Sequence, residues 1–452
     1  MFERLSDEGL AQSSYLIACE RTRMAAVVDP RRDIDAYTST AIRHGLTLAY
    51  AIETHIHADF VSGARELAGL GARVIAGPGA ALRFPFQEAK HGEFLRLGDI
   101  SIEVLHTPGH TPEHISLLVR EPDQPARIFT GDTLFVGAVG RPDLLGADQA
   151  PPLAGQLYDS LFGTLLALDD AVEVYPGHGA GSLCGSGIGT ALHSTIGQER
   201  RFNPLLQQSS RAAFVSAVLD DLPETPPYFP RMKGVNRNGP VVRVLGKGVP
   251  PPSALDARDA TALVEDGAFV IDLRSPEAFG AGHPSGAMNI GFGPRIGYWA
   301  GWLVPPATPL VLLGSDPGHA AVATRQLVRL GFDDVVGYVD GGFDAWRAAG
   351  GHITHIELIS ARELRDRLQR RERLTLVDVR TSQEWLGGHI DEAISIPVGD
   401  LPRRAGELRG PNVVATVCET GYRSSLASSL LVRAGVQVVN VSDGTAAYRM
   451  LE

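Results

Sequence analysis

The sequence predicts an α/β protein of several domains. At 452 residues the chain is longer than one compact domain usually is. In its first half, short apolar runs alternate with glycine-rich loops, and the second half alternates strand-like and helix-like segments. With 44% hydrophobic and 21% charged residues, and no apolar run of about 18 residues, the composition is typical of a globular protein that does not cross a membrane.

The first domain is expected over residues 1–240. Apolar runs at 15–19, 25–28 and 100–105 predict strands, and the patterns at 63–70 and 212–219 predict helices. Prolines are dense at 223–230, so we expect that stretch to be irregular, and three consecutive prolines at 250–252 mark a second break. A linker is therefore expected over 241–252.

The second and third domains, 253–351 and 356–452, are weak copies of each other. The motif Asp272-Leu273-Arg274 matches Asp378-Val379-Arg380, and Gly282-His283 matches Gly388-His389. Strands that alternate with helices predict a parallel sheet covered on both faces. An internal duplication accounts for the repeat.

Charge and cysteine content limit the function classes. A net charge of -11 argues against a general nucleic-acid binder, and we interpret the presence of only three lysines (90, 233 and 247) as composition bias. The three cysteines cannot form a disulfide framework, and their odd number suits a reducing compartment. Since the acidic start lacks an apolar core, it is no secretory signal, and we expect a cytoplasmic protein.

Candidate metal ligands occur in four segments of the first domain, each just after an apolar run. The segments are His55-x-His57-x-Asp59, Thr107-Pro108-Gly109-His110, Thr130-Gly131-Asp132 and Pro176-Gly177-His178. Loops on a rigid sheet can bring such residues together. Phe60 stands where the two-metal motif T-H-x-H-x-D-H has its last histidine, and a phenyl ring cannot ligate a metal. The pattern therefore predicts a site for one metal ion.

These four segments resemble the metallo-β-lactamase fold, an αββα sandwich of two sheets with metal at one edge. Within that superfamily, the stretches at 106–114, 131–135 and 140–143 resemble the persulfide dioxygenases. The resemblance implies one Fe(II) per chain, held by His55, His110 and Asp132. Two imidazoles and one carboxylate suit Fe(II) and leave positions free for O2 and a sulfur substrate.

Five further residues are expected around this site. His57, Asp59 and His178 would support the metal ligands or contact substrate, as groups around metal ligands commonly do. Arg141 is either a structural salt-bridge residue or, as the resemblance implies, a group that attracts an anionic persulfide. Cys184, in a glycine-rich loop after His178, is expected to hold or relay sulfane sulfur.

The third domain carries a second chemical motif at Cys418. An apolar strand leads into the loop Cys418-Glu419-Thr420-Gly421-Tyr422-Arg423, and a helix follows from about Ser424. Loop N–H groups and a helix N-terminus would stabilise an anionic persulfide on that cysteine. Gly421 permits the tight loop, and Arg423 can neutralise an anionic donor or acceptor. A buried inert cysteine and a phosphatase loop are the alternatives.

This domain resembles the rhodanese sulfurtransferases, in which the cysteine carries sulfane sulfur. The loop is short and has no flanking histidine, which favours sulfur transfer over phosphatase chemistry. The second domain has Ser315 and Asp316 at the matching place and no cysteine. It therefore resembles a silent rhodanese domain, expected to bridge the two active domains or to form an oligomer contact.

The whole chain resembles the multidomain persulfide dioxygenase–sulfurtransferases of bacterial sulfide detoxification. The resemblance implies oxidation of a persulfide of glutathione, coenzyme A, bacillithiol or a similar thiol to sulfite with O2. Transfer of sulfur from Cys418 to sulfite would then give thiosulfate. We expect a homo-oligomer without nucleic-acid or membrane partners. The alternatives are a glyoxalase II-type thioester hydrolase, which would hold zinc, and a non-enzymatic persulfide sensor or delivery module.

Overall fold

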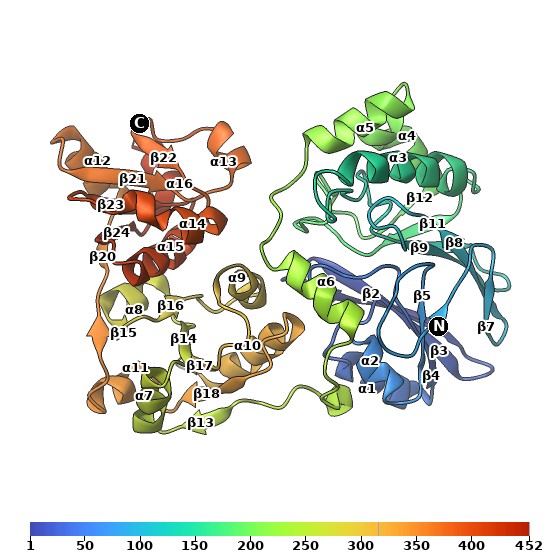
Figure 1. Ribbon diagram of the computed structural model, residues 1–452, viewed down its shortest axis with the longest axis horizontal. Coiled ribbons are helices and arrows are strands. Elements are labelled where there is room, and N and C mark those ends of the chain that lie inside the picture. Colours follow the sequence, from blue (N-terminus) through green and yellow to red (C-terminus); the bar gives the residue numbers. More distant parts are fainter. Residues whose placement is uncertain (315, 452) are drawn as a thin grey trace. The chain divides into compact units, whose positions relative to one another are not determined.

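The computed structural model describes residues 1–314 and 316–451 (Figure 1). The chain forms two compact units. The first comprises Met1–Val249 with Val328–Gly331, and the second comprises Pro250–Leu327 with the residues from Phe332 onward. The predicted domain limits at 240, 253, 351 and 356 stay predictions. Each unit is described by itself.

The first unit contains two six-stranded sheets. One has the order β1-β2-β3-β4-β5-β6 and the other the order β12-β11-β10-β9-β8-β7. The strands are β1 (Phe2–Asp7), β2 (Gln12–Cys19), β3 (Met24–Val28), β4 (Thr47–Ile52), β5 (Arg73–Ala76), β6 (Gln87–Glu88), β7 (Phe94–Leu97), β8 (Ile100–His106), β9 (Ile115–Arg120), β10 (Arg127–Gly131), β11 (Glu173–Pro176) and β12 (Ser194–Thr195).

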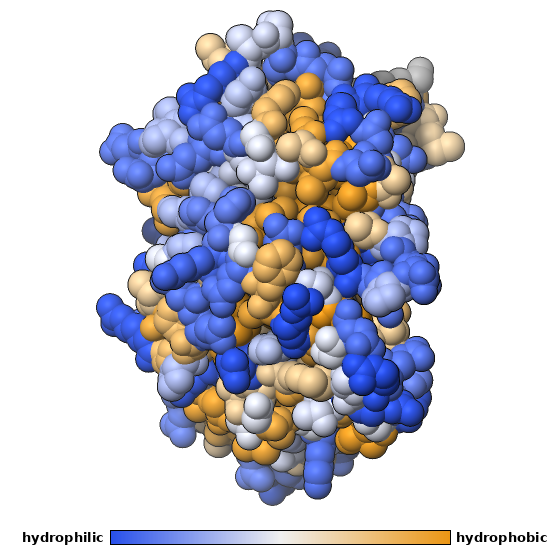
Figure 2. Space-filling view, turned by 90° about the vertical axis from the view of Figure 1, so that its right-hand side faces the viewer, coloured by the Kyte–Doolittle hydropathy of each residue, from blue (hydrophilic) through white to orange (hydrophobic). Residues whose placement is uncertain are grey.

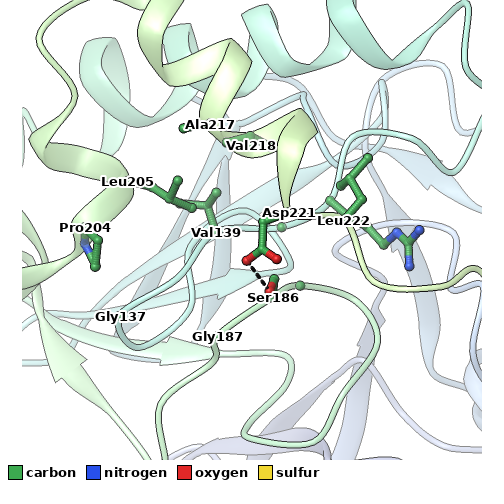
Figure 3. A pocket seen from close by; sticks show the side chains of 13 residues that line it. Gly137, Val139, Ser186, Gly187, Pro204, Leu205, Ala217, Val218, Asp221 and Leu222 are labelled. Atoms are coloured by element: carbon green, nitrogen blue, oxygen red, sulfur yellow. Dashed lines mark hydrogen bonds between the residues drawn. The ribbon is translucent and has the colours of Figure 1, made fainter. Parts of the chain in front are cut away.

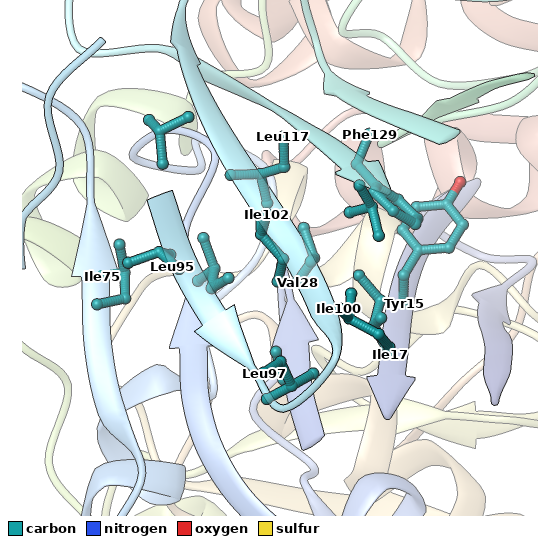
Figure 4. Close-up of a cluster of buried hydrophobic side chains, with 14 of the residues drawn as sticks. Tyr15, Ile17, Val28, Ile75, Leu95, Leu97, Ile100, Ile102, Leu117 and Phe129 are labelled. Carbon is teal, nitrogen blue, oxygen red and sulfur yellow. The ribbon is translucent and has the colours of Figure 1, made fainter. Parts of the chain in front are cut away.

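A hydrophobic core joins the two sheets (Figure 4). Tyr15, Ile17 and Val28 of the first sheet share one buried cluster with Ile102 and Phe129 of the second. Because all eight residues of β2 are buried, both faces of that strand are covered, whereas exposed positions alternate with buried ones along β7. Helices and short helical turns complete the unit: α1 (Asp35–His44), α2 (Ala64–Ala68), α3 (Ala150–Ser160), η1 (Leu161–Leu165), α4 (Ile196–Phe202), η2 (Pro204–Gln207), α5 (Arg211–Asp220), α6 (Phe229–Asn238) and η3 (Leu245–Lys247).

The predicted elements of this unit match the observed ones with one exception. The predicted strands correspond to β2, β3 and β8, and the predicted helices to α2 and α5. The expectation that 223–230 is irregular throughout is wrong at its end, since α6 begins at Phe229. Pro230 lies in the first helical turn, where the missing N–H has no helical partner to lose.

The second unit contains two five-stranded sheets of the same design. The strand orders are β13-β18-β17-β14-β16 and β20-β24-β23-β21-β22, and every pair within them is parallel. The matching orders agree with the sequence repeat. The first sheet and its helices comprise β13 (Ser253–Leu255), α7 (Ala257–Glu265), β14 (Phe269–Asp272), α8 (Pro276–Ala281), β16 (Met288–Asn289), α9 (Ile296–Leu303), β17 (Leu310–Leu313), α10 (Pro317–Arg329), β18 (Val335–Val339) and α11 (Gly342–Ala348), beside the small pair β15 (His283–Pro284) and β19 (Ile353–Thr354).

The last domain repeats this alternation. Its elements are β20 (Glu357–Ile359), α12 (Ala361–Gln369), β21 (Leu374–Asp378), α13 (Ser382–Leu386), β22 (Ala393–Ser395), η4 (Val398–Asp400), α14 (Leu401–Arg404), η5 (Ala405–Leu408), β23 (Val413–Val417), α15 (Tyr422–Arg433), β24 (Val438–Val441) and α16 (Gly444–Arg449). Strand β23 leads directly to Cys418, as the apolar run predicts. Helix α15 begins at Tyr422, two residues earlier than expected.

No helix among the described residues is long and apolar enough to cross a membrane. On the face shown in Figure 2, hydrophilic side chains surround smaller hydrophobic areas.

Candidate metal centre and sulfur-transfer site

The three predicted metal ligands meet in the first unit. The nearest ligand atoms of His55, His110 and Asp132 all lie within 4.8 Å of one another. Asp132 Oδ2 is 3.7 Å from His55 Nε2 and 3.4 Å from His110 Nε2. All three side chains are buried, and none of these three atoms has a hydrogen-bond partner among residues 1–314 and 316–451. Because buried polar atoms are normally satisfied, the residues fit a bound metal ion.

The remaining imidazole nitrogens are already used, which fixes the orientation of both rings. His55 Nδ1 is 3.0 Å from the hydroxyl of Thr54, which donates to Asp29 Oδ2 at 2.8 Å. His110 Nδ1 is 2.8 Å from the carbonyl oxygen of Arg141, to which it donates. Each ring thus keeps Nε2 for a ligand, as metal-binding histidines usually do.

The protonation states suit metal binding. Burial, followed by the charge of His57, holds the pKa of His55 well below its usual value. Burial likewise lowers the pKa of His110. For Asp132, burial alone would raise the pKa, but the neighbouring His178 and His55 lower it well below the usual range. Two neutral imidazoles and one carboxylate result, and these are the forms that ligate a metal.

His178 lies between two carboxylates. Its Nδ1 is 2.8 Å from Asp132 Oδ1, and its Nε2 is 2.8 Å from Asp59 Oδ2. His178 therefore occupies the oxygen of Asp132 that does not face His55 and His110. Asp59 and His178, with Cys184, also form a second group whose ligand atoms lie within 4.8 Å of one another.

Cys184 is buried next to that histidine. It packs against Phe135 and Ala138, and burial raises the pKa of its thiol to about 12. At neutral pH the side chain is therefore a thiol, and a metal would have to displace its proton. Its predicted role in carrying sulfane sulfur stays a prediction.

His57 belongs to a separate polar group. Its Nε2 lies 3.2 Å from Asp29 Oδ1 and 3.1 Å from Glu53 Oε2. Burial alone would lower the pKa of His57, but Asp29 and Glu53 raise it well above the usual value. The buried ring of Phe60 lies 4.4 Å from the His57 ring, centroid to centroid. The two carboxylates therefore favour the protonated form of His57, and the predicted support of the ligands would run through Asp29 and Thr54.

Arg141 is buried, and its hydrogen bonds link segments that are distant in the sequence. Its guanidinium donates to both oxygens of Asp143 at 2.7 Å, to the carbonyl oxygen of Leu183 at 3.0 Å and to the hydroxyl of Thr225 at 2.5 Å. These bonds tie the Cys184 loop to the segment before α6. They match the structural salt bridge named above as one alternative, and binding of an anion by Arg141 stays a prediction.

A cavity of about 240 Å³ lies beside Arg141 (Figure 3). Its walls come from the loops at 137–141 and 185–187, from η2 and from the end of α5. The hydroxyl of Ser186 points to Asp221, to which it donates at 2.6 Å. Much of the lining is apolar, from Val139, Leu205 and Val218. The cavity is large enough for a small organic group.

Two supporting residues, His114 and Asn236, were not predicted. His114 accepts a hydrogen bond from the backbone N–H of Asp132 at 3.0 Å and lies 3.0 Å from the hydroxyl of Thr133. Its place at the end of the motif at 106–114 could have indicated a supporting role. Asn236 donates to the carbonyl oxygens of His57 and Phe60, both at 2.8 Å. No sequence signal marked Asn236, because it reaches the ligand loop only through the packing of α6.

The predicted sulfur-transfer site, at Cys418, lies at the end of β23. Cys418 is buried, and its sulfur accepts the backbone N–H groups of Gly421 at 3.2 Å and Ser424 at 3.4 Å. Gly421 has φ +92°, and a Cβ there would lie 2.0 Å from the carbonyl oxygen of Ser442. A glycine is therefore required, and the loop has the geometry that stabilises negative charge on sulfur.

Arg423 is paired with a carboxylate. Its guanidinium donates to both oxygens of Glu384, at 2.6 and 2.7 Å. The hydrogen bonds from Arg423 lower the pKa of Glu384 to about 2. An incoming anion would have to share this arginine with Glu384, so the predicted neutralising role stays a prediction.

The second domain contacts the Cys418 loop within the same unit. The Tyr422 hydroxyl donates to the carbonyl oxygen of Gly291 at 3.2 Å, and the Ser425 hydroxyl donates to Asn289 Oδ1 at 2.6 Å. At its own matching position the second domain has Asp316, while Ser315 lies outside the described residues.

Comparisons with known proteins agree with this architecture. A family described as "Metallo-beta-lactamase superfamily" matches residues 7–178, and one described as "Rhodanese-like domain" matches 256–349 and 360–451. A crystal structure of a metallo-beta-lactamase from Staphylococcus aureus is 34% identical, covers 75% of this chain and 98% of its own, and has a TM-score of 0.66.

Two shorter proteins are similar as well. The crystal structure of ETHE1 from Myxococcus xanthus is 32% identical, covering 54% of this chain and 99% of its own with a TM-score of 0.46. Hydroxyacylglutathione hydrolase GloC from Haemophilus influenzae is 30% identical over 44% of this chain and 95% of its own. The chain therefore belongs to the metallo-beta-lactamase superfamily and carries two rhodanese-like domains after its metallo-beta-lactamase domain.

Proposed function

We propose that this protein oxidises low-molecular-weight persulfides with O2 at one ferrous iron per chain and transfers sulfane sulfur to the sulfite formed. The observation that carries this proposal is the group His55, His110 and Asp132, with three buried ligand atoms that lack partners among the described residues. Two imidazoles and one carboxylate suit Fe(II) and leave coordination positions open.

The oxidation step balances with water as co-reactant. R–S–SH, O2 and H2O give R–SH and sulfurous acid, which ionises to sulfite, and the terminal sulfur is oxidised while O2 is reduced. Iron, when bound, supplies the activation of O2. The carbonyl oxygen of Arg141 and the hydroxyl of Thr54 hold the two histidines in place. Since His178 takes one oxygen of Asp132, that carboxylate presents a single free oxygen.

The transfer step uses Cys418. Its thiolate takes the outer sulfur of a second R–S–SH, which releases R–SH and leaves a persulfide on the cysteine. Sulfite then takes that sulfur to form thiosulfate, and the thiolate is restored. The N–H groups of Gly421 and Ser424 that now face the sulfur would stabilise the anionic persulfide.

Metal analysis combined with O2 uptake tests the oxidation step. Protein loaded with iron under anaerobic conditions is expected to hold one iron per chain. It should consume O2 and release sulfite with a persulfide of glutathione, coenzyme A or bacillithiol. His110→Ala should lose the iron, whereas His106→Ala is the matched control because His106 bonds to Pro112 outside the ligand group. The absence of O2 uptake with all three persulfides would refute the proposal.

A thioester hydrolase of the glyoxalase II type is the second candidate. Two observations favour it: the additional group of Asp59, His178 and Cys184, and the similarity to a protein named hydroxyacylglutathione hydrolase. Hydrolysis would use metal-bound hydroxide, usually with two zinc ions. Two zincs per chain with thioester turnover would favour this candidate, and one iron with O2 uptake would favour oxidation.

The cellular setting is also a proposal. We infer a homo-oligomer in the cytoplasm that binds small thiol persulfides and neither nucleic acid nor membrane. The net charge of -11 supports the exclusion of nucleic acid. Sedimentation of the purified chain would give its oligomeric state, and cell fractionation would give its location.

A further inference from the structure

Helix α15 of the third domain carries a row of polar side chains that contact the second domain, within the second unit. Tyr422, Ser425 and Ser429 follow one another at spacings of three and four residues, which places them on one face of the helix. Ser425 and Ser429 are buried, although serines lie mostly at protein surfaces. A buried hydroxyl requires a hydrogen-bond partner, and the second domain supplies one for each of these three residues.

Two of these partners belong to Asn289, on the edge strand β16. This strand is the last of its sheet, so its outer edge has no neighbouring strand. The backbone N–H of Asn289 donates to the Ser429 hydroxyl at 3.3 Å, and its side-chain Oδ1 accepts the Ser425 hydroxyl at 2.6 Å. The amide nitrogen of Asn289 donates to the carbonyl oxygens of Asp272 at 3.2 Å and Arg274 at 2.9 Å. The sheet of the second domain therefore fixes Oδ1 of Asn289 toward α15.

Ser425 connects this contact to the sulfur loop. Its backbone N–H donates to the carbonyl oxygen of Gly421 at 3.1 Å and so closes the first turn of α15. Gly421 and Ser424 are the residues whose N–H groups the Cys418 sulfur accepts. One serine thus bonds to Asn289 through its side chain and to the sulfur loop through its backbone. A shift of α15 away from β16 would change both N–H to sulfur distances.

Further contacts hold both ends of the same helix. The Tyr422 hydroxyl donates to the carbonyl oxygen of Gly291 at 3.2 Å, and a Cβ added at Gly291 would lie 3.2 Å from the Tyr422 ring. At the other end, Val432 packs against the core of the second domain, and the guanidinium of Arg433 lies 4.3 Å from the ring centroid of Phe269. The second domain therefore contacts α15 from its first turn to its last.

We propose that Asn289 of the second domain is a positioning residue for sulfur transfer, which holds α15 so that the N–H groups of Gly421 and Ser424 face the sulfur of Cys418. The inference deepens the proposed function and rests on it for the reaction. When sulfite takes the outer sulfur of the Cys418 persulfide, the S–S bond breaks and its electron pair stays on the cysteine sulfur. The two N–H groups stabilise that charge. The domain without a cysteine thus serves the chemistry of the domain that has one.

Anaerobic transfer assays test this role, because the oxidation step needs O2. Thiosulfate would be measured from glutathione persulfide and sulfite, with Cys418→Ser as the blank for the uncatalysed reaction. Asn289→Ala and Ser425→Ala should each lower kcat about 3- to 10-fold, the range for one lost hydrogen bond, and leave the KM for sulfite unchanged. The double variant should lose no more than Asn289→Ala alone, since both changes remove the same contact. Ser428→Ala is the matched control on α15 and should keep its kcat, because its hydroxyl bonds to Thr416 of its own domain at 2.7 Å.

Hydrogen exchange gives a second readout, which does not depend on activity. Mass spectrometry should show faster exchange of the loop 418–424 in Asn289→Ala and Ser425→Ala than in the unaltered protein, and no change in Ser428→Ala. Unchanged kcat or unchanged loop exchange in either folded variant would overturn the inference, as would an equal loss in Ser428→Ala. If the unaltered chain makes no thiosulfate, the transfer step of the proposed function fails, and the exchange measurement alone decides the positioning role.

Discussion

The two rhodanese-like domains share one framework, and only the third has a cysteine in the loop after its central strand. In the second domain, Arg274 pairs with Asp272 and donates to the carbonyl oxygen of Gly282 at 2.8 Å. In the third, Arg380 pairs with Asp378 and donates to the carbonyl oxygen of Gly388, also at 2.8 Å.

A ring contact is repeated in the same way. His283 stacks on Phe279 with centroids 3.7 Å apart, and His389 stacks on Trp385 at 3.6 Å. Since the second domain keeps these features without a cysteine, they serve the fold. The sulfur transfer proposed for the third domain must therefore depend on the loop that follows β23.

The largest expected effect is at that loop. Cys418→Ser should reduce thiosulfate formation on the order of 1000-fold or more, because the side chain that would carry the sulfur is lost. Sulfite release should continue. Simultaneous assay of sulfite and thiosulfate would check this, with Cys19→Ser as the matched control on a core strand. Unchanged thiosulfate formation would show that the two domains do not differ in the proposed way.

The shared aspartates should matter equally for stability. Asp272→Asn and Asp378→Asn each break a buried ion pair, which typically costs about 3 kcal/mol or more. Denaturant unfolding should show similar losses for both variants. A loss confined to one variant would mean that the frameworks are not equivalent.

Gly421→Ala should disturb the Cys418 loop. The added Cβ would meet the carbonyl oxygen of Ser442, and φ +92° disfavours an L side chain, so we expect a loss of roughly 2 kcal/mol or more together with weaker sulfur transfer. Gly435→Ala is the control, because its φ is +79° and nothing lies within 4 Å of the added atom. Equal losses in the two variants would assign the effect to backbone conformation alone.

The smallest effect is expected at the pair of Arg423 and Glu384. The pKa of Glu384 is lowered to about 2 by Arg423, so its stabilising contribution is present above the ordinary value of 4.5 and is lost as pH falls toward 2. Both side chains are partly exposed, so the contribution should be under about 1 kcal/mol. The melting temperatures of the unaltered protein and of Glu384→Gln should therefore differ slightly at pH 7. This difference should shrink as the pH falls from 4.5 toward 2. A constant difference across that range would contradict the ion pair.

Local sequence signals predicted the fold class and the segments that carry the candidate metal ligands, and the family resemblance selected three residues from those segments. Apolar strands followed by His55, His110 or Asp132 place those residues at strand ends, where the structure brings them together. Local sequence could not predict the partners of the two arginines. Thr225 lies 84 residues from Arg141, and Glu384 lies 39 residues from Arg423.

Asn236 holds the loop that follows His55, and this contact matters while the chain is being synthesised. His55, His110, Asp132 and His178 all precede residue 179, yet the side chain that holds the carbonyl oxygens of His57 and Phe60 is added 58 residues after His178. A nascent chain that ends before α6 would contain all the ligands and lack the brace on their loop. The candidate metal site would thus reach its final form only when helix α6 has left the ribosome.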